Sequence, residues 1–149
     1  MPITLATPSD IPALCELLEV LFTQEAEFQP DRRVQGRGLA DIIGNPQAGH
    51  ILVARRDGQV VGMVGLLYTI STALGGRVAW MEDLVVASPA RNAGLGSQLL
   101  RRALECARDN GCLRVTLLTD RDNLPAQRFY QRHGFNLSAM IPMRLSLGD

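Results

Sequence analysis

Apolar residues along the chain alternate between two spacings, one typical of helices and one typical of strands. Helical spacing, with apolar residues three or four positions apart, covers about 11–22, 34–43, 95–107 and 124–133. Short apolar or alternating runs predict strands at about 3–6, 51–54, 60–69, 78–86, 115–118 and 143–147. Asp57-Gly58 and Gly75-Gly76 are turn signals between consecutive strands, so the middle of the chain should be antiparallel. The strand at 115–118 follows a helix, and this crossover predicts that it runs parallel to the 78–86 strand.

These elements predict a single α/β domain over residues 1–149. We expect a mixed, mostly antiparallel central sheet of about six to seven strands, flanked by about four helices. The 46% of hydrophobic residues can form a core without disulfide or metal support. No apolar run is long enough to cross a membrane and the first ten residues lack a signal-peptide pattern, so we expect a cytoplasmic protein.

Composition excludes several kinds of chemistry. All fifteen basic residues are arginine, so neither a Schiff-base lysine nor a Walker-type phosphate loop is present. The formal net charge is zero, which argues against nucleic acid or an anionic membrane as partner. Three cysteines without CxxC spacing predict neither a disulfide framework nor a metal site.

The most informative segment runs from Leu84 to Ser97, where a predicted strand ends and a helix begins with Arg91-x-x-Gly94-x-Gly96. A helix N-terminus offers backbone N–H groups and the positive end of a dipole, which together favour an anion such as pyrophosphate. An ordinary helix start, in which the glycines only form the turn, is the competing interpretation. A dinucleotide fingerprint requires a different glycine spacing within a parallel βαβ unit.

This segment resembles the acetyl-CoA-binding motif of the GNAT superfamily of N-acetyltransferases. A second stretch, Asn123 to Phe135, resembles another motif of that family, Asn-x-x-Ala-x-x-Phe-Tyr-x-x-x-Gly-Phe. The order of elements agrees along essentially the whole chain. The resemblance implies a GNAT-like fold that binds acetyl-CoA through residues Leu84, Val85, Val86, Arg91, Asn92, Ala93, Gly94, Leu95, Gly96, Ser97, Asn123 and Ala126. Asn92 and Ala93 depart from the family pattern, which often has glycine and a basic residue there; Asn123 could instead serve as a helix N-cap.

The implied reaction is direct attack of a primary amine on the thioester within a ternary complex. Glu82 is the candidate base, because a lysine-like amine with a pKa near 10.4 needs help to lose its proton. By strand alternation Glu82 shares a face with Trp80 and Leu84, whereas a β-bulge would bring Asp83 to that face instead. An ion pair with arginine is the structural alternative for Glu82.

Tyr130 is the candidate acid, because a neutral tyrosine can protonate the departing thiolate of CoA. The resemblance supports this role, and that of Glu82 through a similar Leu-Glu-Asp run in polyamine acetyltransferases. A purely packing role for Tyr130 is the alternative.

The acceptor is a small molecule or a peptide that the sequence does not identify. Glu25, Tyr68, Trp80 and Asp83 are candidate acceptor-binding residues, and they suggest a cationic amine with some apolar body. A catalytically silent acyl-CoA-binding sensor or structural subunit is the alternative function. Many relatives form dimers, so the resemblance makes a homodimer possible, while nothing in this sequence fixes the oligomeric state.

Overall fold

The computed structural model describes residues 2–24, 29–87 and 94–148, which divide into two compact units. The first unit, Met1–Leu117, contains the sheet and the first three α-helices. The second unit, Leu118–Asp149, contains the helix α4 (Leu124–Arg132) and the segment that follows it.

The sheet of the first unit has five strands in the order β1-β2-β3-β4-β5. Its elements are β1 (Ile3–Leu5), the short 3-10 helix η1 (Pro8–Asp10), α1 (Ile11–Gln24), α2 (Arg32–Ile43), β2 (Gly49–Arg56), β3 (Gln59–Ser71), β4 (Gly76–Val86), α3 (Leu95–Asp109) and β5 (Val115–Leu117). The first four strands pair antiparallel and β5 pairs with β4 in parallel, so both predictions of strand direction are confirmed.

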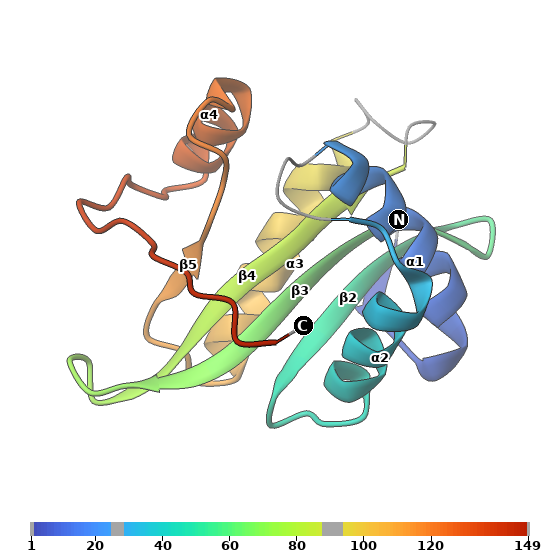
Figure 1. Ribbon diagram of the computed structural model, residues 1–149, viewed down its shortest axis with the longest axis horizontal. Helices are drawn as coiled ribbons and strands as arrows, with labels where there is room; N and C mark the ends of the chain where they lie inside the picture. The colour runs from blue at the N-terminus through green and yellow to red at the C-terminus, as the bar shows by residue number, and fades with distance from the viewer. Residues whose placement is uncertain (1, 25–28, 88–93, 149) are drawn as a thin grey trace. The chain divides into compact units, whose positions relative to one another are not determined.

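Helices cover both faces of this sheet, with α1 and α2 on one side and α3 on the other (Figure 1). Met63 of β3 belongs to the same buried cluster as Leu14 of α1, whereas a Cβ at the adjacent Gly62 would lie 2.8 Å from the side chain of Leu99 in α3. From Gly62 onward, even-numbered residues of β3 therefore face α3, and odd-numbered ones face α1 and α2.

The predicted apolar face of α3 is its buried face. Leu95, Leu99, Leu100, Ala103 and Ala107 are each at most 2% exposed. Complete burial of a leucine side chain contributes about 1.5–3 kcal/mol, so this face is a main source of the attachment of α3 to the sheet.

β4 contains a bulge that the sequence pattern did not reveal. Gly65 pairs with Glu82 and Met63 pairs with Val85, so Asp83 and Leu84 together oppose Val64. Asp83 adopts a left-handed conformation with φ of 59°, which disrupts regular alternation along the strand. The prediction that Glu82 shares a face with Leu84 is therefore wrong, because Val85 takes that place.

The sheet has five strands in the described residues, not six to seven, and the predicted strand at 143–147 is wrong. This segment is irregular, and its alternating apolar side chains Ile141, Met143, Leu145 and Leu147 are 70–93% exposed. Alternation produces a strand only where a neighbouring strand supplies backbone hydrogen-bond partners, and the segment takes part in none of the ladders described. No helix in the described part of the chain is long and apolar enough to cross a membrane.

Candidate active site

The first part of the candidate site lies on β4, where Trp80 and Glu82 share the sheet face opposite α3. Met81 between them pairs with Leu66, and both are buried on the α3 side. Trp80 is 40% exposed and Glu82 is also exposed. Gly65 pairs with Glu82 and carries no side chain, which leaves room on the strand next to the carboxylate. The strand therefore presents an acid and a large aromatic ring on one accessible surface.

Glu82 also lies at the point where the sheet stops being regular. The parallel pairing of β4 with β5 ends at Met81 and Leu117, one residue before Glu82. The bulge at Asp83 and Leu84 follows immediately, while β4 continues beside β3 to Val86. In the part of the chain that the structure describes, no arginine forms an ion pair with Glu82. The carboxylate is thus available to an incoming ligand rather than committed to a structural pair.

The start of α3 provides a second part of the site. Gly94 is the N-cap residue with φ of 72° and ψ of 11°, and among the described residues no side chain caps this helix end. A Cβ at Gly94 would meet nothing within 4 Å, so the requirement for glycine comes from the left-handed backbone alone. Leu95, 2% exposed, anchors the first turn, and Gly96 and Ser97 follow within the helix. The first-turn amides and the helix dipole favour a negatively charged group at this end.

Four of the sequence-predicted site residues lie outside the described residues. These are Glu25, Arg91, Asn92 and Ala93.

The second unit carries the remaining candidates on α4. Asn123 is its N-cap residue and accepts a hydrogen bond through Oδ1 from the backbone N–H of Ala126 at 3.1 Å. Tyr130 is half-buried about two turns after Asn123, and its ring packs edge-on against Phe129 and Phe135 at centroid distances of 5.3 and 5.9 Å. The aromatic neighbours fix the ring of Tyr130 within this unit.

These features agree with what sequence comparison finds. A sequence model of the acetyltransferase (GNAT) family matches residues 11–135. The chain belongs to this family.

Two relatives within the GNAT family have informative names. The aminoalkylphosphonate N-acetyltransferase of Salmonella typhimurium is 33% identical over 133 residues, 89% of this chain and 83% of that protein. The glucosamine 6-phosphate N-acetyltransferase of Trypanosoma brucei brucei is 37% identical over 143 residues, 93% and 90% of the two chains. A crystal structure of an acetyltransferase from Trypanosoma brucei superposes with a TM-score of 0.74 at 30% identity, covering 98% of this chain and 99% of that one. The resemblance is confirmed, and the chain is an N-acetyltransferase of the GNAT family.

Tyr68, which the sequence grouped with Trp80, lies on the other side of the sheet. As an even-numbered residue of β3 it faces α3, and its hydroxyl oxygen lies 2.6 Å from Nδ1 of His50 and 3.9 Å from Sγ of Cys106. Burial, followed by the charge of Arg77, lowers the pKa of His50. The structure thus places Tyr68 in a polar cluster under α3, away from the face of Glu82. Cross-strand alternation in the sequence is the signal that could have separated the two residues.

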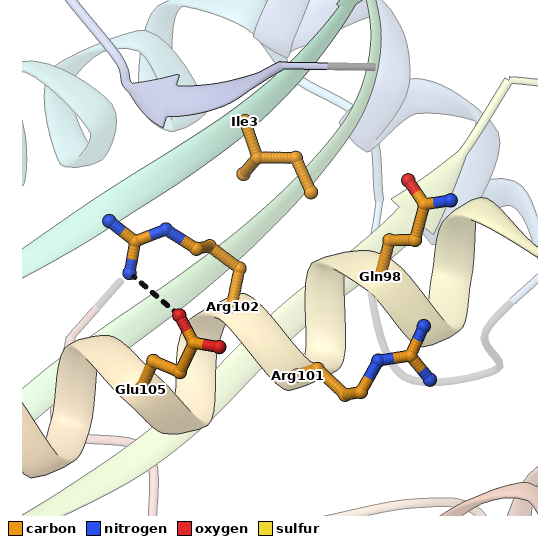
Figure 2. Close-up of a pocket in the computed structure, with 5 residues that line it drawn as sticks. All are labelled: Ile3, Gln98, Arg101, Arg102 and Glu105. Atoms are coloured by element: carbon orange, nitrogen blue, oxygen red, sulfur yellow. Dashed lines mark ion pairs between the residues drawn. The ribbon is translucent and has the colours of Figure 1, made fainter.

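A shallow cavity of about 310 Å³ lies between β1 and α3, lined by Ile3, Gln98, Arg101, Arg102 and Glu105 (Figure 2). Arg102 pairs with Glu105 at 3.6 Å, and the side chain of Arg101 extends away from that of Arg102. Because the two guanidinium groups do not converge on one point, we assign neither acetyl-CoA nor the acceptor amine to this cavity. Among the described residues, no group of three or more His, Cys, Asp or Glu side chains could hold a metal ion.

Proposed function

We propose that this chain transfers an acetyl group from acetyl-CoA directly to a primary amine, with Glu82 as general base and Tyr130 as general acid. The observation that carries the proposal is the exposed carboxylate of Glu82 at the bulge of β4, in a chain of the GNAT family. A base at this position accepts the ammonium proton, and the neutral amine then attacks the thioester carbonyl. The attacking nitrogen loses its remaining extra proton to solvent as the C–S bond breaks and the amide forms. The hydroxyl of Tyr130 donates a proton to the CoA thiolate and regains one from solvent.

The donor would bind along the bulged end of β4 and the start of α3. Backbone groups of Leu84, Val85 and Val86 would hold the pantetheine arm and polarise the thioester, as an oxyanion hole does. The pyrophosphate would lie at the first turn of α3, with Arg91 as an additional charge. In α4, Asn123 uses Oδ1 to cap the helix, so its amide nitrogen is the atom that would donate to the donor arm.

The acceptor that we favour is a small primary amine carrying a phosphonate or phosphate group. The two relatives named for their substrates act on an aminoalkylphosphonate and on glucosamine 6-phosphate, both amines with a phosphorus oxyanion. A chain whose basic residues are all arginine suits such a group, because guanidinium binds phosphoryl oxygens in bidentate fashion. Trp80 would support the ammonium end beside Glu82 through a cation–π contact.

Donor binding is tested by calorimetry with acetyl-CoA, comparing wild type with Gly94→Trp. The control is Gly75→Trp, because Gly75 has nearly the same φ, 73°, and equally open surroundings, but lies in the turn before β4. We expect micromolar-range binding in wild type and in Gly75→Trp, and loss of binding in Gly94→Trp. No binding in wild type would contradict the proposal at its first step.

The acceptor class is tested with matched amines. Release of the CoA thiol is measured with 2-aminoethylphosphonate against 2-aminoethanol, and with glucosamine 6-phosphate against glucosamine. We expect kcat/KM to be at least about tenfold higher for the phosphorus-bearing member of one pair, since a bidentate charged contact contributes roughly 1.5–3 kcal/mol. Equal rates within both pairs would remove the phosphoryl preference and leave the acetyltransferase proposal intact. Donor binding without turnover of any amine would favour a silent acyl-CoA sensor.

A further inference from the structure

Two cysteines, Cys106 and Cys112, lie on either side of the turn that closes α3. Gly111 has φ of 77°, its N–H donates to the carbonyl oxygen of Arg108 at 3.0 Å, and the N–H of Cys112 donates to that of Ala107 at 2.9 Å. These two bonds define a Schellman motif, in which the residue after the left-handed glycine packs back on the last helical turn. The side chain of Cys112 therefore folds over the turn that contains Cys106.

The surroundings of the two sulfur atoms agree with this placement. The Tyr68 hydroxyl lies 3.9 Å from Sγ of Cys106, and the amide nitrogen of Asn110 lies 3.6 Å from the same sulfur. Burial raises the pKa of Tyr68, and negative charge on Cys106 or on Cys112 raises it further. The Cys106 thiol is thus in contact with this hydroxyl, and negative charge on Cys106 also raises the pKa of Cys112.

The two thiols differ in access. Cys106 is 8% exposed, whereas Cys112 is half-buried and open to small reagents. Burial raises the pKa of Cys112, and the nearby charge of Arg77 partly offsets this effect. Cys112 is consequently the thiol that a reagent meets first, reacting slowly at neutral pH and faster as pH rises, and Cys106 is the thiol that can follow.

We propose that Cys106 and Cys112 form a reversible intramolecular disulfide when a small hydroperoxide is supplied. The Cys112 thiolate attacks one peroxide oxygen, the O–O bond breaks, and the other oxygen leaves as water or alcohol. Cys106 then attacks the resulting sulfenic acid, the S–O bond breaks, water leaves, and the S–S bond forms. The two thiols lose two electrons and the hydroperoxide gains them.

The disulfide would lie between the last turn of α3 and the lead-in to β5, beside β4. The backbone of this lead-in is already tied to β4, since the N–H of Leu113 donates to the carbonyl oxygen of Arg77 at 2.8 Å. Oxidation would therefore add a covalent bond between elements that already pack together. Cys15, buried among the side chains of α1 and α2, takes no part.

The test uses the full chain, fully reduced and then treated with hydrogen peroxide under conditions that oxidise free dithiothreitol. We expect a mass loss of about 2 Da, a fall in alkylatable thiols from three to one, and a cross-linked peptide joining Cys106 to Cys112. Dithiothreitol should restore all three thiols. Three alkylatable thiols after treatment, or a cross-link that includes Cys15 or a second chain, would overturn the proposal.

Variants assign the roles of the two thiols. Cys106→Ser should stop oxidation at an overoxidised Cys112, because the resolving thiol is missing. Cys112→Ser should leave Cys106 reduced, because burial shields it. Cys15→Ser is the matched control and should form the same cross-link as wild type. Loss of the cross-link in Cys15→Ser would contradict the assignment, and the wild-type measurement stands even if a variant fails to fold.

Discussion

The strand register shifts at two places in the described sheet, and a charged side chain lies at each shift. We call these the first interruption (β2–β3) and the second interruption (β3–β4). Between β2 and β3 the register shifts after Ala54, and Arg55 there donates two hydrogen bonds to Asp10 at 2.9 and 2.7 Å. Between β3 and β4 the shift follows Glu82, which is exposed and has no ion pair among the described residues. A register shift thus accompanies a structural ion pair at the first place and an exposed carboxylate without an ion pair among the described residues at the second. What separates them is the presence of an opposite charge within reach.

Removing the charge from the first interruption should have the largest effect on stability. Asp10 is 6% exposed, and its Oδ2 also accepts the N–H of Thr7 at 2.8 Å. We expect Asp10→Asn to lower the free energy of unfolding by about 1.5–3 kcal/mol, because it weakens charge-assisted bonds to Arg55. Urea denaturation at neutral pH measures this loss. A change near zero would show that the pair contributes nothing net to folding.

The same pair predicts a pH dependence. The hydrogen bond from Arg55 is the main reason why the pKa of Asp10 lies below its ordinary value of 3.8. Because the folded-state pKa is the lower one, the stabilisation is complete above the unfolded-state pKa and disappears as pH falls through the folded-state value. Wild type should therefore lose more stability than Asp10→Asn on acidification below about pH 4. Parallel pH profiles would contradict this account.

The second interruption can be tested through its backbone. Asp83 has φ of 59°, which aspartate and asparagine tolerate better than other side chains do. We expect Asp83→Val to lower the free energy of unfolding by about 1–2 kcal/mol, and Asp83→Asn to change it much less. Equal stability of the two variants would mean that the left-handed conformation at Asp83 is not maintained in solution.

The smallest expected effect concerns Trp80, which shares the accessible face with Glu82. Trp80→Ala should raise KM for the amine by up to about tenfold, because a cation–π contact contributes roughly 0.5–2 kcal/mol. The affinity for acetyl-CoA, measured by calorimetry, should stay close to that of wild type. A weaker donor affinity at unchanged amine KM would assign Trp80 to the donor site instead.

Local patterns were sufficient to predict most of the first unit. The antiparallel middle strands, the parallel fifth strand and the buried face of α3 follow from spacing and turn signals that act within about ten residues. The bulge at Asp83 did not follow, because the left-handed conformation of a single residue leaves no periodic signal in the sequence; in the structure it brings Val85 into the core cluster beside α1 and α2. The strand predicted at 143–147 failed because alternation says nothing about whether a pairing partner is at hand.

The candidate site was predictable only in part, because alternation shows which residues of one strand share a face but not how neighbouring strands pair. Glu82 and Trp80 do share a face, as alternation within β4 requires. Tyr68 was misplaced because its grouping rested on residue type and not on register with β4, where Ala79 is its partner.

The central claim is that Glu82 removes the amine proton, and the pH profile of turnover by wild type and Glu82→Gln tests it most directly. Asp83→Asn is the matched control, since it neutralises the neighbouring carboxylate and tolerates the same backbone conformation. With the best amine of the matched pairs, we predict that Glu82→Gln lowers kcat/KM by about 10²–10⁴-fold at neutral pH. The ratio of wild-type to variant kcat/KM should fall as pH rises, because the amine then loses its proton in solution without help from a base. A ratio that stays constant across pH, or an equal loss in Asp83→Asn, would contradict the assignment of Glu82 as the base.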